Sequence, residues 1–321
     1  SNTELINYNE SISMVERLIS NVRNSDFSDS HVPFLCFLNG IVDASSYEKE
    51  LRELSSYCSD PEIVRVHSDA NFELSLPFTH YIPLTKEFFS LFDDEIYSLF
   101  LDFYNHKNHL DYDKYSLASY SGVSYYIPTI KKGIIALNKD RPSLDKLEVL
   151  FHEYGHLVGI GLDDYRYFVS SNLTEIEAYF FELLAQDFLS TNLNDSRIDV
   201  YRTSNITTVS KMAYSIVSEL DFYRERGESA LHEAYEWYID NRPEDVDMIS
   251  NFKYAYSFLV AVELYEMYKQ DPKEGIEAFK NIMRAKDNEF GVINEFVNVG
   301  DSLDGFVSDA KVKTKRFLSS N

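Results

Sequence analysis

The chain is poor in cysteine, in basic residues and in long apolar runs, and each shortage excludes a class of protein. Its two cysteines, Cys36 and Cys58, fit no metal-ligand spacing and are too few for a disulfide scaffold, although one disulfide between them stays open. Lys and Arg total 30 against 53 Asp and Glu, and the formal net charge of −23 excludes nucleic acid and anionic membranes as expected partners. No apolar run reaches membrane-spanning length.

The rest of the composition is that of a globular protein with a sizeable core. The 321 residues suffice for one large or two modest domains, and 44% of them are hydrophobic. No internal repeat, low-complexity tract or flexible linker divides them. No signal peptide is visible, so we expect a cytoplasmic protein, with a removed signal peptide and the oligomeric state left open.

One motif stands out, an H-E-x-x-H sequence that begins at His152 and ends at His156. It lies in an apolar, proline-free run over residues 143–160, which predicts a buried helix that ends at Gly159 and Gly161. Two histidines four residues apart share one face of a helix and can bind the same tetrahedral Zn²⁺. The spacing therefore predicts a zinc site on this helix.

The residue after the first histidine of the motif, Glu153, has a role in the same chemistry. By helical geometry it lies close enough to a metal-bound water to act as its general base. The alternative interpretation is a pair of core histidines bonded to their neighbours. Because two buried imidazoles and a carboxylate are costly without a metal, we favour the zinc site.

A second predicted helix, at residues 173–188, is apolar on nearly every side and therefore belongs in the interior. Acidic residues in a buried helix are costly unless they bind a metal or a polar partner, so a buried acid here is expected to have such a role. Glu175, Glu182 and Gln186 fall on one stripe, and Glu175 suits a third zinc ligand from a following helix. Glu182 is placed to accept a hydrogen bond from a ligand histidine and fix its tautomer. Glu177 is the second choice for the ligand, and we expect it to face solvent.

The remaining elements are mostly helical. Two segments rich in β-branched and aromatic residues, at 116–128 and 132–138, predict a pair of strands that precedes the zinc helix. These strands either bind a peptide by backbone pairing at the sheet edge or form a hairpin that covers the core. Residues 61–85 are expected to be irregular because Pro77 and Pro83 interrupt them. Further helices are predicted at residues 3–23, 46–57, 86–106, 208–226, 228–241, 251–269, 272–286 and 303–318, and a short apolar segment at 32–42.

Four blocks of this sequence resemble the M3 family of zinc oligopeptidases, the thimet oligopeptidase and oligoendopeptidase F group. They are the strand region with Ser121-Gly122 and Ile134–Asn138, the block Leu150–His156, the block Thr174–Glu182 and the block Tyr254–Phe258. In the third block, Glu177-Ala178-Tyr179 stands where the family usually has Pro-Ser or Ser-Thr. The resemblance covers roughly residues 115–318.

The resemblance implies that His152, His156 and Glu175 bind the zinc and that Glu153 is the base. It makes Tyr254 and Tyr256 candidate contacts of the oxyanion or substrate. The implied fold is mainly α, a zincin-like metallopeptidase domain with a small β-hairpin beside the zinc helix and a deep cleft that admits short peptides. We expect an N-terminal helical region at residues 1–114 and a catalytic domain at 115–321.

The resulting hypothesis is a zinc-dependent metallopeptidase of the oligoendopeptidase type that hydrolyses short peptides. Two alternatives stay open. The first is a non-catalytic peptide-binding protein that keeps the metal as a structural relic. The second is a protease dedicated to one protein partner.

Overall fold

The structure is a computed structural model that describes residues 47–63, 72–105, 110–111, 122–127, 132–137, 143–163, 175–226, 250–285 and 289–320. The chain divides into two compact units, described separately below. Unit 1 contains Ser1–Asp60 and Thr207–Tyr256, and unit 2 contains Pro61–Ile206 and Ser257–Asn321. The helices predicted at residues 3–23 and 228–241 and the apolar segment at 32–42 lie outside the described residues. The expected boundary between residues 114 and 115 stays a prediction.

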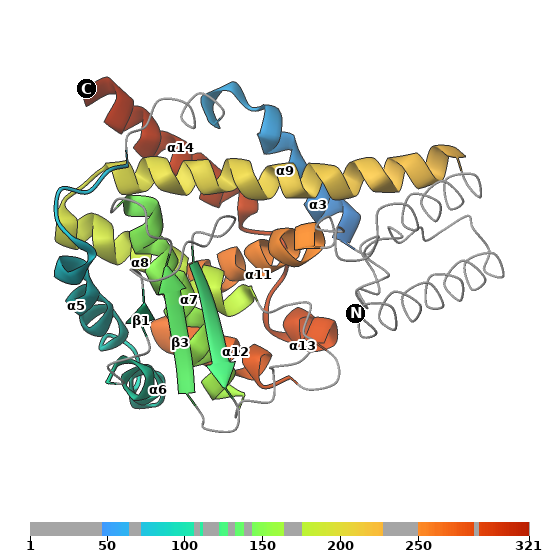
Figure 1. Ribbon diagram of the computed structural model, residues 1–321. Coiled ribbons are helices and arrows are strands. Elements are labelled where there is room, and N and C mark those ends of the chain that lie inside the picture. The colour runs from blue at the N-terminus through green and yellow to red at the C-terminus, as the bar shows by residue number, and fades with distance from the viewer. Residues whose placement is uncertain are drawn as a thin grey trace, which may run out of the picture. The chain divides into compact units, whose positions relative to one another are not determined.

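Helices make up most of the described residues, as the prediction of a mainly α fold requires (Figure 1). No helix among them is both long and apolar enough to cross a membrane. In chain order the elements are α3 (Glu48–Ser56), the 3₁₀ helix η2 (Tyr57–Ser59), α5 (Phe78–Phe89), α6 (Asp94–Tyr104), β1 (Leu110–Asp111), β2 (Gly122–Ile127), β3 (Lys132–Leu137), α7 (Leu144–Leu162), α8 (Ile176–Leu193), α9 (Arg197–Arg226), α11 (Ser250–Gln270), α12 (Pro272–Met283), α13 (Glu289–Phe296) and α14 (Leu303–Ser320).

Unit 2 is built around α7, which packs against α8, α6 and the sheet. The helix does not stop at Gly159 as predicted, but continues through Gly159 and Gly161 to Leu162. These glycines serve close packing instead. A Cβ at Gly155 would lie 3.1 Å from the backbone oxygen of Glu177 on α8, and a Cβ at Gly161 would lie 2.7 Å from Leu99 Cδ2 on α6. The glycines therefore let two neighbouring helices approach the α7 backbone, and they cost helix propensity without ending the helix.

A three-stranded sheet in the order β1-β3-β2 lies along α7 (Figure 1). β2 and β3 fall within the segments predicted as strands, and they pair antiparallel with Tyr125 opposite Ile134. β1 was not predicted; it is two residues long and pairs parallel with β3. A Cβ at Gly133 would lie 2.7 Å from Leu157 Cδ2, so the sheet packs directly on α7 at this point.

The segment expected to be irregular at residues 61–85 contains much of α5, and the single helix predicted at 86–106 is two helices. Tyr81, Thr85, Phe88 and Phe89 form a buried stripe at helical spacing, whereas Pro83 is exposed on the opposite side. The burial of this stripe outweighs the one backbone hydrogen bond that proline removes at the surface. The break between α5 and α6 comes from Asp93, whose carboxylate caps α6 by accepting from Ile96 N at 3.0 Å.

Aromatic rings from four helices fill the core between α5, α6, α7 and α8. The Phe89 ring stacks on Phe100 at 4.5 Å and lies 5.2 Å from Phe181, while Phe100 meets Tyr154 edge-on at 5.0 Å. Pairs of this kind contribute about 0.5–1.5 kcal/mol each beyond the burial of their area. This cluster explains the heavy aromatic content and fixes α7 and α8 to their neighbours.

Two helix boundaries differ from the prediction because of one short turn. α9 begins at Arg197, well before residue 208, and α8 runs on to Leu193, beyond residue 188. Asn194 ends α8 in the left-handed conformation (φ 48°), which asparagine tolerates. Asp195 then accepts a hydrogen bond from Arg197 N at 3.0 Å and starts α9. α13 was not predicted at all.

In unit 1, α3 agrees with the helix predicted at residues 46–57. Arg52 on α3 forms ion pairs with Glu48 at 2.7 Å and with Asp221 of α9 at 2.6 Å. Tyr47 packs its ring 4.5 Å from Tyr256.

Candidate metal centre

Three side chains of unit 2 converge, each placed by the helix beside it. α7 presents His152 and His156 one turn apart, with ring centroids separated by 4.9 Å. Glu175 directly precedes α8 in helical backbone conformation, and its Oε2 lies 3.1 Å from His152 Nε2 and 3.3 Å from His156 Nε2. All three donor atoms lie within 4.8 Å of one another, so the group could hold a metal ion.

The donor set fits Zn²⁺ in kind, and the two distances from Glu175 to the imidazoles fit it in spacing. Tetrahedral coordination with bonds of about 2.0–2.1 Å separates neighbouring ligand atoms by about 3.3 Å. The separations of 3.1 and 3.3 Å between Glu175 and the two imidazoles agree with this value. Two imidazole nitrogens and one carboxylate oxygen are donors that zinc accepts, and a three-ligand set leaves one position for water or substrate.

The three side chains also shift one another's protonation. Burial disfavours a charged imidazole, but hydrogen bonds with Glu175 and Glu182 outweigh it and raise the pKa of His152 to about 10. Burial likewise opposes a positive charge on His156, yet the charge of Glu175 raises the pKa of His156 well above its ordinary value. Burial favours a neutral Glu175, but the two histidines lower its pKa far below the usual range. A cation that binds here must therefore displace protons from the histidines.

The second nitrogen of His152 is bonded to a carboxylate of α8. His152 Nδ1 lies 2.8 Å from Glu182 Oε2, and Asn205 Nδ2 of α9 donates to Glu182 Oε1 at 3.0 Å. Because Nδ1 donates to Glu182, Nε2 is the nitrogen that points toward Glu175 and that binds a cation once its own proton is displaced. The structure therefore places Glu182 where the sequence analysis expected it.

The expectation that Glu177 faces solvent is wrong. Glu177 is 3% exposed, and its Oε1 lies 3.0 Å from His156 Nδ1. The prediction failed because it placed this acid in solvent although the helix was expected to be buried, and α8 is enclosed on the Glu177 side as well. The glycines of α7 leave room for the Glu177 side chain between the two helices. Each histidine thus has a carboxylate partner on its outer nitrogen.

Glu153, the predicted base, lies on α7 between the two histidines in sequence and is 5% exposed. Among the residues that the structure describes, no group forms a hydrogen bond or ion pair with its carboxylate. One turn before His152, Glu148 is fully buried, and burial raises the pKa of its carboxyl well above the ordinary value. Its burial thus disfavours a further negative charge next to Glu153, Glu175, Glu177 and Glu182.

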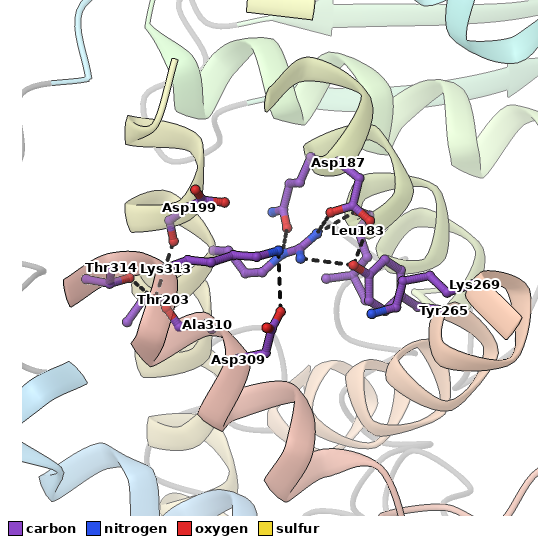
Figure 2. A network of polar contacts seen from close by, with 12 residues as sticks. Leu183, Asp187, Asp199, Thr203, Tyr265, Lys269, Asp309, Ala310, Lys313 and Thr314 are labelled. Carbon is purple, nitrogen blue, oxygen red and sulfur yellow. Dashed lines mark hydrogen bonds and ion pairs between the residues drawn. The ribbon is translucent and has the colours of Figure 1, made fainter. Parts of the chain in front are cut away.

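A buried arginine of α9 holds α8 through several hydrogen bonds, in a polar network that includes Leu183, Asp187 and Tyr265 (Figure 2). Arg202 of α9 donates to Gln186 Oε1 at 2.6 Å, to the Leu183 carbonyl at 2.8 Å and to Asp187 at 3.1 Å. It also donates to the Tyr265 hydroxyl at 3.1 Å. Gln186, which shares a stripe with Glu175 and Glu182, therefore anchors the helix rather than the metal site.

The two tyrosines proposed as substrate or oxyanion contacts belong to unit 1, whereas the histidines belong to unit 2. Tyr256 is fully buried and its ring stacks on Phe252 at 5.5 Å. Tyr254 is half-buried, with the Lys253 ammonium 5.7 Å from its ring centroid. The role assigned to these tyrosines stays a prediction.

Two residues that support the site were not predicted from the sequence. Asn205 lies far along the chain in a polar stretch of α9, and no sequence pattern marked it. Tyr179 of α8 meets the His152 ring edge-on at 5.7 Å between centroids. The one available signal was that Glu177 and Tyr179 stand in the block that departs from the family pattern.

No protein-family model matches this chain, and no curated protein sequence matches it. Solved structures with a similar fold include PZ peptidase A in complex with an inhibitor, which is 11% identical with a TM-score of 0.56 over 90% of this chain and 64% of that one. A protein assigned as oligoendopeptidase F is 12% identical with a TM-score of 0.57 over 99% of this chain and 66% of that one. Another protein with that assignment, from Bacillus anthracis, is 12% identical with a TM-score of 0.50 over 86% and 55%.

These likenesses concern the fold. This chain is mainly α and has the architecture of the oligoendopeptidase-like peptidases, so the predicted fold class is confirmed. The chain spans less than two thirds of the length of each of these structures.

Proposed function

We propose that this chain is a zinc-dependent metallopeptidase that hydrolyses peptide bonds in short peptides. The observation that carries the proposal is the convergence of His152 Nε2, His156 Nε2 and Glu175 Oε2, with Glu175 at 3.1 and 3.3 Å from the two nitrogens. The fold that it shares with PZ peptidase A and oligoendopeptidase F supports peptides as the substrate class.

In this proposal His152, His156 and Glu175 would hold a Zn²⁺ ion, which as a Lewis acid would polarise the scissile carbonyl and lower the pKa of bound water toward neutral. A carboxylate oxygen of Glu153 takes a proton from the water whose oxygen attacks the carbonyl carbon, and then gives that proton to the nitrogen of the leaving amine. A tyrosine hydroxyl that donates to the oxyanion on the carbonyl oxygen, the role predicted for Tyr254 or Tyr256, would complete this mechanism.

A non-catalytic peptide-binding protein with a structural metal is the second candidate, and Glu153 separates the two. A purely structural site has no use for a buried carboxylate beside the ligands. In the described part of the chain no group pairs with that carboxylate, which leaves it free to accept a proton and supports the catalytic role. A chelator should silence a catalytic site with the fold intact, whereas loss of a structural zinc should unfold the protein.

The deciding experiment compares Glu153→Gln with the wild type on a peptide mixture read by mass spectrometry. We expect Glu153→Gln to retain zinc and to lose about 10²–10⁴-fold in kcat because the general base is gone. Glu87→Gln, an exposed change on α5, is the matched control and should leave turnover unchanged. Undiminished turnover in Glu153→Gln would exclude the proposed mechanism. Cleavage of one protein, without cleavage of short peptides, would favour a protease dedicated to a single partner.

A further inference from the structure

We propose that Glu177 is a positioning residue for His156 and that Gly159 is the residue that makes its position available. Gly159 on α7 makes room for the side chain of Glu177 on α8, and Glu177 orients the His156 ring so that Nε2 points toward the metal site. This inference rests on the proposed zinc site and adds to it a residue that the H-E-x-x-H motif does not specify.

The contact between Glu177 and His156 is short and shielded from water. Glu177 Oε1 lies 3.0 Å from His156 Nδ1, and the two side chains are 4% and 14% exposed. A carboxylate on Nδ1 holds a proton there, so Nε2, which lies 3.3 Å from Glu175 Oε2, is the nitrogen left to bind the cation. The hydrogen bond also fixes the rotation of the ring about its χ2 bond. Both effects direct Nε2 toward the other two ligands.

Glu177 has little else to hold its carboxylate in place. Among the described residues its second oxygen, Oε2, is buried without a hydrogen-bond partner. The corresponding carboxylate on the other histidine, Glu182, receives an additional hydrogen bond from Asn205 at 3.0 Å. The orientation of Glu177 therefore depends on His156, on a contact with its own backbone and on the packing around the stem of the Glu177 side chain.

Gly159 provides that packing. A Cβ at residue 159 would lie 2.5 Å from Glu177 Cγ and 2.8 Å from Glu177 Cβ. These atoms are the root of the side chain, so a rotation of the carboxylate alone cannot relieve the clash. Any side chain at residue 159 must shift the Glu177 stem or separate the two helices. The absence of a side chain at residue 159 is thus a requirement of the contact between Glu177 and His156.

The same observations allow a purely structural role, in which the hydrogen bond to His156 only satisfies the buried carboxylate of Glu177 and does not affect metal binding. The two roles differ in what they predict for metal binding. A structural role changes the stability of the fold and leaves zinc affinity as it was. A positioning role changes zinc affinity when the hydrogen bond is lost, and an amide at residue 177 should preserve most of it because the amide oxygen still accepts from Nδ1.

The test measures zinc affinity by competition with a chromophoric chelator, which needs no turnover. We expect Glu177→Leu to lose about 10–100-fold in affinity, and Glu177→Gln to retain most of the wild-type affinity. Gly159→Ala should lose affinity to a similar degree. The double variant Gly159→Ala/Glu177→Leu should lose no more than the worse single variant, because both changes remove one contact.

Gly161→Ala is the matched control, since its Cβ would meet the flexible end of Leu99 on α6, away from Glu177. Its zinc affinity should equal that of the wild type. Circular dichroism of each variant after chelation checks that the fold is intact. If Gly159→Ala does not fold, the zinc affinities of Glu177→Leu and of Glu177→Gln, which conserves the shape of the side chain, still test the inference. Wild-type affinity in Glu177→Leu, or fully additive losses in the double variant, would overturn the inference. A wild-type chain that binds no zinc would instead remove the proposed function.

Discussion

The two histidines of the site are supported by two different arrangements. The His152 arm consists of His152, Glu182 and Asn205, which are joined by hydrogen bonds of 2.8 and 3.0 Å. The His156 arm consists of His156, Glu177 and Gly159, in which one hydrogen bond of 3.0 Å is combined with close packing on a glycine. A chain of hydrogen bonds thus orients the His152 ring, whereas one hydrogen bond together with close packing orients the His156 ring.

Because one arm is polar and the other is packed, the two arms should tolerate different substitutions. A polar chain depends on the donors and acceptors in it, so conservative polar replacements weaken it by small steps. A packed carboxylate depends on the volume beside it, so a single added methyl group on α7 is enough to displace it. Both carboxylates lie on α8, which makes the anchoring of that helix common to the two arms.

The largest expected effect comes from Arg202→Met, which removes the anchor shared by both arms. The change leaves Gln186 Oε1 and the Leu183 carbonyl without their donor while it keeps apolar volume beside Tyr265. We expect a loss of about 2–5 kcal/mol in the free energy of unfolding, measured by urea denaturation. Arg316→Met, on an exposed position of α14, is the control. A loss below about 1 kcal/mol for Arg202→Met would mean that α8 is anchored by its apolar contacts alone.

Next in size is Glu182→Leu, which breaks the His152 arm and leaves the His156 arm intact. We expect zinc affinity to fall about 10–100-fold because His152 loses the partner of its Nδ1. Combined with Gly159→Ala, the losses should add in free energy because the two changes act on separate arms. Chelator competition on the two single variants and the double variant measures this. A double variant no worse than either single variant would show that the arms are one unit.

The pH dependence of stability in the presence of excess chelator tests the charge balance of the arms. The folded protein holds a proton on His152 up to a pKa of about 10, whereas an unfolded histidine loses it near 6.5. The stabilisation is complete below pH 6.5 and is lost as the pH rises toward 10, at up to about 1.4 kcal/mol per pH unit for one proton. The lowered pKa of Glu175 has the opposite sign, and its contribution is lost as the pH falls below its ordinary value of 4.5.

Urea denaturation at pH 7, 8 and 9 should therefore give a decreasing free energy of unfolding. Glu182→Leu removes one cause of the raised His152 pKa and should flatten the decrease. A wild-type free energy that stays constant or rises over this range would contradict the ion pairing between the histidines and their carboxylates.

The smallest expected effect is that of Asn205→Ala, at the outer end of the His152 arm. The change removes one hydrogen bond to Glu182 Oε1 but leaves the bond between Glu182 and His152. We expect a stability loss of about 0.5–1.5 kcal/mol and a decrease in zinc affinity below about tenfold. Calorimetry and chelator competition provide the two values. If Asn205→Ala lost more zinc affinity than Glu182→Leu, Asn205 rather than Glu182 would be the main support of His152, contrary to the account.

The convergence of the two histidines on α7 could be predicted because their geometry is local. Four residues separate His152 and His156, and any α-helix places such a pair on one face. Glu175 could be chosen because it lies seven residues before Glu182, and its backbone is helical even though it stands just outside α8. Spacing along a helix was therefore sufficient to select the three side chains that converge and Glu182 beside them.

The support of the site could not be predicted because it depends on contacts between distant segments. Whether Glu177 faced solvent or protein was decided by the glycines of α7, which were interpreted as a helix end. Asn205 reaches Glu182 from a different helix. Pro83 suggested irregular structure, but tertiary burial of Phe88 and Phe89 decided the helix. In each case packing overrode a local signal.

The most direct test of the central claim is the zinc-to-protein ratio of the purified chain, measured by mass spectrometry of the metal after reconstitution and dialysis. We predict about one zinc per chain for the wild type and for Glu153→Gln, and almost none for His156→Ala, because the site has three protein ligands and the base is not one of them. A wild-type chain without zinc, or a His156→Ala variant that retains it fully, would contradict the account.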